Sequence, residues 1–204
     1  MESGWLLLAL CYLSPLCNLS VALFSARATQ HAIIILLAAP LIAWSLSSAT
    51  VVHSERLPVA NIAFMVALWL WHMPLLLDAT LQNNVVYWAM NLSIVAAAIW
   101  LWYETFRSDG LRAFVGVAFT SIQMTMLGAL LSFAAAPFYS VYAVTTIPWG
   151  LTQLGDQQLG GLIMWVPAGV LIVAYSAFTL WLWLDRLDRR RDPSDVLHSY
   201  SAET

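Results

Sequence analysis

Six long apolar runs dominate this chain and restrict what it can fold into. Each is close to the roughly 20 residues that an α-helix needs to cross a hydrocarbon core about 30 Å thick. Backbone N–H and C=O groups in lipid must find partners within their own segment, so the runs are predicted to be helices and not strands. We place the spans at residues 4–25, 31–52, 58–77, 84–106, 112–136 and 157–184.

The composition supports the same class of protein. Of the 204 residues, 61% are hydrophobic and 9% are charged, whereas soluble domains are about half apolar and about one quarter charged. The first run opens with Glu2 and not with a basic segment, so we expect a retained span and not a cleaved signal peptide. The predicted fold is all-α, a polytopic membrane helix bundle with six transmembrane helices in residues 1–185 and a tail over residues 186–204.

Arginines predict the orientation, because the chain contains no lysine. Only Arg27 falls in a loop on one side of the predicted bundle. The other side and the tail carry Arg56, Arg107, Arg112, Arg186, Arg189, Arg190 and Arg191. The positive-inside rule therefore predicts that both termini are cytoplasmic and that the loops at 26–30, 78–83 and 137–156 face outward. The formal net charge of -3 argues against nucleic acid as a partner and leaves membrane lipid as the surroundings.

The stretch from Trp69 to Pro74 contains an ionisable residue at membrane depth. His72 is about 14 residues, or roughly 21 Å, from the inner end of its predicted helix, which places it less than about 10 Å beneath the outer face. Ionisable residues inside a membrane are candidates for function, and Pro74 loosens the helical turn that holds His72. The alternative is a neutral histidine that hydrogen-bonds a neighbouring helix.

The stretch from Asp156 to Trp165 opens the sixth span. Asp156, Gly160 and Met164 stand four residues apart, so they share one face of a helix. We expect Asp156 to cap the N-terminus of its own helix. Gly160 and Gly161 lower helix propensity, so another element is expected to pack closely against them. The preceding loop adds interfacial aromatic residues, and the set predicted to bind a partner is Tyr139, Tyr142, Trp149, Gly160 and Gly161.

Several potential metal ligands are predicted to lie at one depth beneath the outer face. Imidazole nitrogens and thioether sulfurs are ligands that suit a soft cation such as Cu(I). We therefore predict copper ligands at His72 and Met164, which share this depth, and at His31, which lies just above them. Residues at the entrance to this site or behind its ligands are predicted to be Asp156, Gln157, Met73, Met90 and Asn91.

Three segments resemble the multi-spanning CtaG-type cytochrome c oxidase assembly factors. In addition, His31 together with residues 36–41 is similar to the pattern that this family shows in its second span. The resemblance covers roughly residues 28–184, and its segments are Trp69–Pro74, Leu131–Phe133 with Pro137–Tyr139 and Tyr142, and Asp156–Trp165.

The resemblance implies a multi-pass protein of the bacterial plasma membrane that helps to assemble a haem-copper oxidase of the respiratory chain. Its partners would be cytochrome c oxidase subunits, and its action would be copper insertion or subunit holding on the periplasmic side, without catalysis. This chain departs from the family pattern at three positions. Tyr87 and Asn91 stand where a pair of histidines is expected, and Arg27 stands where another histidine often precedes His31.

Two other functions are compatible with these residues. One is an accessory subunit that holds the oxidase through the 139–149 loop and the Gly160–Gly161 face, without binding metal. The other is a b-type haem protein that uses His31 and His72 as axial ligands.

Overall fold

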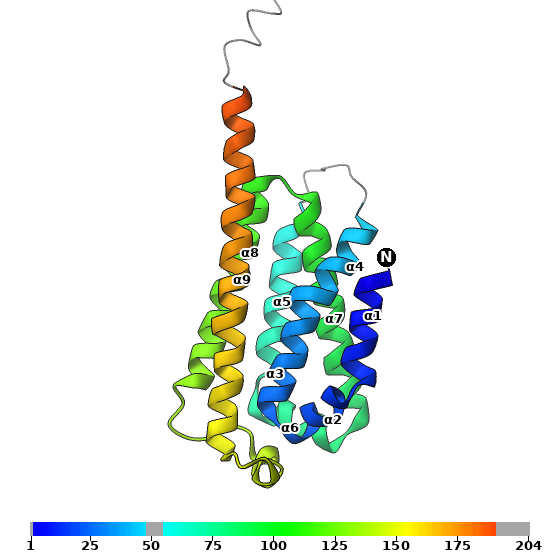
Figure 1. Cartoon of the computed structure of the whole chain (residues 1–204), viewed down its shortest axis with the longest axis vertical. Helices are drawn as coiled ribbons and strands as arrows, with labels where there is room; N and C mark the ends of the chain where they lie inside the picture. The colour runs from blue at the N-terminus through cyan, green and yellow to red at the C-terminus, as the bar shows by residue number, and fades with distance from the viewer. Residues whose placement is uncertain (1, 48–54, 191–204) are drawn as a thin grey trace, which may run out of the picture.

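The protein is described by a computed structural model that covers residues 2–47 and 55–190. Within these ranges every regular element is helical, which confirms the all-α prediction. Figure 1 shows the helices lying side by side as a bundle, with α8 and α9 paired along one flank. The α-helices are α1 Glu2–Leu13, α2 Pro15–Ala22, α3 Phe24–Ile33, α4 Ala39–Leu46, α5 Leu57–Trp71, α6 Pro74–Gln82, α7 Asn84–Arg107, α8 Gly110–Ser132 and α9 Gln153–Arg190.

Three of the described helices are long and apolar enough to cross a membrane. They are Phe24–Leu46, Asn84–Arg107 and Gly110–Ser132, and two bent pairs, α1 with α2 and α5 with α6, raise the candidates to five. The start of α1 and the far end of α9 lie at the same end of the bundle (Figure 1). Six spans and cytoplasmic termini stay predictions.

The second span begins earlier than predicted. Its helix starts at Phe24 and not at residue 31, so the expected outer loop at 26–30 is helical. Arg27 was placed in that loop and is instead 2% exposed. Hydropathy predicts too late a start for this helix because Arg27 and Gln30 are polar. Both side chains nevertheless form hydrogen bonds inside the bundle. Gln30 Nε2 donates to the carbonyl of Cys11 at 2.7 Å, and Arg27 Nε donates to the carbonyl of Ser20 at 3.2 Å.

Two predicted spans are bent where proline interrupts the helix. The first bends by 53° between α1 and α2, and the third bends by 73° between α5 and α6. Pro15 and Pro74 each begin the second helix of their pair, where a missing N–H costs nothing. The expected loop at 78–83 is therefore helical as far as Gln82, and His72 lies at the bend.

The helix that carries His31 contains a wider turn directly after it. Residues Ile34–Ala38 (η1) form a π-helical turn between α3 and α4. Pro40 has no N–H to offer the carbonyl four residues earlier, which favours such a change of register. The last helix, α9, extends past the predicted boundary at 185 to Arg190, and residues 191–204 of the predicted tail lie outside the described ranges.

Glycines set the close approach of α8 and α9. A Cβ atom on Gly161 would lie 2.7 Å from the carbonyl oxygen of Gly128 and 2.7 Å from the backbone N of Ser132. These neighbours are backbone atoms of the facing helix, so they cannot turn aside. Gly128 and Ser132, four residues apart on α8, thus lie on a packing surface for α9.

We expect Gly161→Ala to destabilise the protein by about 1–3 kcal/mol, because the added methyl group overpacks the α8–α9 contact. The matched control is Gly169→Ala on the same helix, where the nearest atom to a new Cβ, Thr125 Oγ1, is 3.7 Å away. That control should be neutral or stabilising by up to about 1 kcal/mol through helix propensity. Unfolding in mixed micelles, followed by circular dichroism, measures both, and equal stabilities would contradict the packing argument.

Candidate functional site

A small cavity brings together the three residues predicted as copper ligands. His31 from α3, His72 at the end of α5 and Met164 from α9 all line it, and its volume is about 20 Å³. A space of this size holds a single water-sized atom. Two further residues with polar or soft side chains also line it, Arg27 from α3 and Met124 from α8.

His72 is held by the bend between α5 and α6. Its Nδ1 lies 2.7 Å from the carbonyl oxygen of Leu68, one turn back in α5. A carbonyl only accepts, so Nδ1 carries the proton and Nε2 is the nitrogen with a lone pair. The backbone oxygen of His72 accepts a hydrogen bond from the Tyr139 hydroxyl at 3.0 Å, which ties the bend to the loop between α8 and α9 (residues 133–152), called the outer loop here after the side on which it is predicted to lie.

His31 presents an unpartnered nitrogen. The residue is 8% exposed, and its Nε2 has no hydrogen-bond partner among the described residues. Buried nitrogens without a partner are rare in folded proteins and call for an explanation such as an ion or a water. The missing partner makes His31 the stronger of the two imidazole candidates.

Sequence reasoning missed Met124. Thr120, Met124 and Gly128 stand four residues apart on α8, a spacing that is typical of a helix-packing stripe. Met124 does lie on that stripe and is 2% exposed, but it lines the cavity together with Met164. The spacing could have indicated this, because residues on the inward face of a helix all point into the bundle, including the sulfur of Met124.

Arg27 places a buried positive charge at the same cavity. Its Nη1 donates to Thr80 Oγ1 at 2.7 Å, and its guanidinium lies 5.9 Å from the centroid of the Tyr142 ring. Its Nη2 is buried without a partner among the described residues. Arg27 stands four residues before His31 on one helix, and this i, i+4 spacing could have placed both on one face.

Asp156 caps a helix, but not its own as predicted. It is fully buried in the first turn of α9, and its carboxylate accepts from the N-terminus of α3. The donors are the backbone N–H groups of Phe24 at 2.6 Å and Ser25 at 3.1 Å, together with the Ser25 hydroxyl at 2.5 Å. The carboxylate reaches α3 because the two helices pack side by side there.

The face of Asp156, Gly160 and Met164 packs along α3. A side chain on Gly160 would collide with the Phe24 ring, and Gly161 faces α8. The two glycines predicted to bind a partner are therefore covered by helices of this chain. Gln157 is also buried, and its side-chain oxygen accepts from the backbone N–H of Phe138 at 2.6 Å.

The aromatic residues of the outer loop divide into buried and exposed members. Tyr139 and Tyr142 are each 1% exposed, and Phe24 stacks on Tyr139 with ring centroids 4.8 Å apart. Burial raises the pKa of Tyr142 to about 12, so its hydroxyl stays protonated and donates to the carbonyl of Ser20 at 3.3 Å. Trp149 is 53% exposed and remains available to a partner.

The remaining predicted residues lie around the cavity without lining it. Met90 is buried, with its sulfur 3.9 Å from Arg27 Nη1. Asn91 accepts from the Tyr12 hydroxyl at 3.1 Å and donates to the carbonyl of Tyr87 at 2.8 Å. Met73 lies with His72 on a second, open groove of about 260 Å³ between α5, α8 and the outer loop. His72 thus borders both the inner cavity and this outer groove.

The donor set limits the chemistry of the site. No three histidine, cysteine, aspartate or glutamate side chains gather in the part of the chain that the structure describes. A metal here would be held by imidazole and thioether groups, which favour soft monovalent copper over harder cations.

A known family model covers most of this chain. The family model of the cytochrome c oxidase caa3 assembly factor (Caa3_CtaG) matches residues 2–186. The chain belongs to this family. The match includes every residue that lines the cavity, and it confirms the resemblance found in the sequence. Comparisons with curated proteins and with solved structures give no match.

In this caa3 assembly factor family member, we expect Asp156→Ala to cost about 3 kcal/mol of stability. The change leaves two N–H groups and one hydroxyl at the start of α3 buried without an acceptor. The control is Asp109→Ala, which removes an exposed cap from α8, where Asp109 Oδ1 accepts from the N–H of Arg112 at 3.0 Å. An exposed cap is worth about 1 kcal/mol. Denaturant unfolding in micelles that gives equal losses for both variants would contradict the cap between helices.

Proposed function

We propose that this protein assists the assembly of a haem-copper cytochrome c oxidase by holding Cu(I) transiently near the periplasmic face of the bacterial plasma membrane. Membership in the caa3 assembly factor family supports the assembly role. The copper role is supported by one observation above all: His31, His72 and Met164, from three different helices, line one small cavity.

The cavity residues fit a copper cargo in their chemistry. The unpartnered Nε2 of His31 and the remaining Nε2 of His72 provide nitrogen donors, and Met164 and Met124 provide sulfur donors. The outer groove with Met73 gives a route to His72 from the membrane surface. These groups would bind the ion and shield it from water, and the protein need supply no catalytic step.

Arg27 favours release over storage. A fixed positive charge at the same cavity repels a cation, and in partly buried surroundings such repulsion amounts to several kcal/mol at about 4 Å. Each 1.4 kcal/mol weakens binding about tenfold. A carrier that passes copper to an oxidase subunit needs such moderate affinity.

The haem alternative is disfavoured by the size of the cavity. A porphyrin would have to lie between His31 and His72, and the space that they share is about 20 Å³. Because protein interiors are close-packed, admitting a haem would require the surrounding helices to separate.

We expect His31→Ala, His72→Ala and Met164→Leu each to weaken Cu(I) binding by about tenfold or more, as loss of a ligand does at metal sites. Competition with a Cu(I) chelator measures the affinity of the purified protein. Met126→Leu is the matched control, because Met126 is 54% exposed on the outside of α8. Unchanged affinity in all three variants, together with normal oxidase copper content in cells, would remove copper from the proposal and leave the assembly role standing.

We expect Arg27→Gln to tighten Cu(I) binding by about a hundredfold or more, because it removes a repulsion of several kcal/mol. Cells that carry this variant should assemble less active oxidase, since copper is released more slowly. Arg107→Gln, at the opposite end of α7 from the cavity, should change neither quantity. Weaker copper binding by Arg27→Gln would show that the guanidinium supports the site instead of opposing it.

A second candidate function is favoured by the outer loop. Val144, Ile147 and Trp149 are 70%, 67% and 53% exposed, and apolar side chains so displayed suit a protein partner or lipid head groups. We propose that this loop holds an oxidase subunit during assembly. Ile147→Ser with Trp149→Ser should reduce co-purification with immature oxidase while leaving Cu(I) affinity unchanged. Stable association with the mature enzyme alone would instead indicate an accessory subunit.

A further inference from the structure

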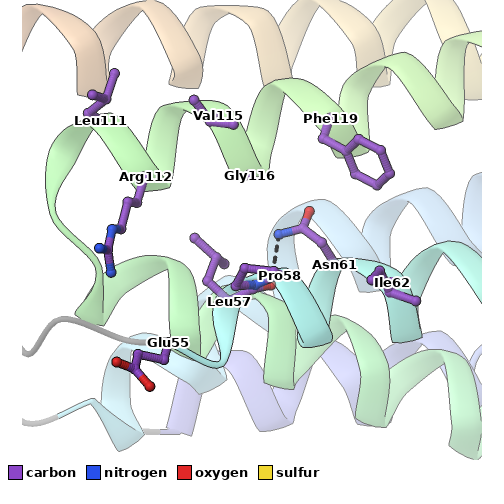
Figure 2. A pocket seen from close by; sticks show the side chains of 10 residues that line it. All are labelled: Glu55, Leu57, Pro58, Asn61, Ile62, Leu111, Arg112, Val115, Gly116 and Phe119. Atoms are coloured by element: carbon purple, nitrogen blue, oxygen red, sulfur yellow. Dashed lines mark hydrogen bonds between the residues drawn. The ribbon is translucent and has the colours of Figure 1, made fainter.

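Another open groove lies where α5 and α8 begin, at the opposite end of α5 from His72. It is a groove of about 700 Å³ between α5 and α8, within the range of small-molecule sites. Figure 2 shows Pro58, Asn61 and Ile62 of α5 facing Val115 and Phe119 of α8 across it. Ile62 and Val115 are 53% and 57% exposed, so the groove opens on the outside of the bundle, where the acyl chains of the membrane lie.

The floor of the groove is largely apolar. Asn61 is its one buried polar side chain, and each end of the amide already has a partner. Its Nδ2 donates to the carbonyl of Leu57 at 3.0 Å, and its Oδ1 accepts from Thr120 at 2.8 Å (Figure 2 shows the first bond). Gly116 leaves the amide uncovered, because a Cβ there would lie 2.9 Å from Asn61 Nδ2. The depth of the groove therefore suits a hydrocarbon chain.

One end of the groove carries charge of both signs. Arg112 and Glu55 lie there together (Figure 2), next to the first residues of α5 and α8. Apolar helices that begin at a membrane surface place this end at the level of the head groups. Asp109 pairs with Arg112 Nε at 3.4 Å, and Arg56 adjoins Glu55 in sequence. The two charged side chains that line the groove, Arg112 and Glu55, sum to zero formal charge, which suits a zwitterionic head group better than an anionic one.

We propose that this groove binds one phospholipid with a zwitterionic, ammonium-bearing head group, namely phosphatidylethanolamine. One acyl chain lies between α5 and α8 over Asn61 and Gly116. The phosphate accepts hydrogen bonds from the Arg112 guanidinium, and the ammonium donates to the Glu55 carboxylate. A quaternary ammonium has no N–H to donate, so phosphatidylcholine would lose the second contact. The proposal depends on the membrane location of the chain and not on copper or on the oxidase.

The test uses the full chain reconstituted in vesicles with equal amounts of phosphatidylethanolamine, phosphatidylcholine and phosphatidylglycerol. Native mass spectrometry after mild detergent extraction reports which lipids stay bound. We expect one phosphatidylethanolamine per chain, retained about tenfold over each of the other two. Equal retention of the three lipids, preference for phosphatidylglycerol, absence of a retained lipid, or a dimer that seals the groove would each overturn the proposal.

Variants separate the groove from the rest of the surface. Val115→Trp should fill the groove and reduce retention about tenfold, whereas Ile122→Trp, equally exposed on α8 at 56% but outside the groove, should not. Glu55→Gln should abolish the preference for phosphatidylethanolamine over phosphatidylcholine. Arg112→Gln should weaken the binding of all three lipids. All four substituted side chains are exposed or lie on the rim of the groove, so the variants should still fold. Retention that is unchanged in Val115→Trp would place the lipid elsewhere.

Discussion

The carboxylate of Asp156 at the start of α3 is the contact on which the arrangement of the cavity end of the bundle depends. It satisfies the free N–H groups of Phe24 and Ser25 from a different helix. Buried helix ends need such partners because water is not available to them. By fixing where α9 crosses α3, the cap sets the register of the turns that follow. Gly160 then meets Phe24, and one turn further Met164 reaches the cavity.

Proline bends serve the same site from the other side of the bundle. The 73° break between α5 and α6 ends the helix at His72, and the Leu68 carbonyl and the Tyr139 hydroxyl hold that end. In a straight helix the His72 carbonyl would accept a helical hydrogen bond. It would then not be free to accept the hydrogen bond from the Tyr139 hydroxyl. The site is thus built where regular helix gives way, as is common for functional positions in membrane proteins.

Membrane proteins tolerate a buried arginine only when its surroundings are polar enough, and Arg27 shows how this is done. A carbonyl, a hydroxyl and an aromatic face surround its guanidinium. To solvate this guanidinium, the bundle buries several polar groups, and burying polar groups inside a membrane is energetically unfavourable. Such an unfavourable charge beside two imidazoles is easier to explain if it adjusts the proposed affinity of the cavity for a cation than if it only fills space.

The sequence by itself determined the helical class, most of the helix positions and the family, because apolar length and motif residues are local properties. It also predicted His72 and Met164 at one depth, with His31 just above them, since rise per residue converts position into height. Only the tertiary structure decided which helix Asp156 caps, that Arg27 lies inside and that Met124 joins the cavity. Those outcomes depend on the rotation and crossing of helices distant in sequence, and hydropathy does not encode rotation when a span is apolar on every side.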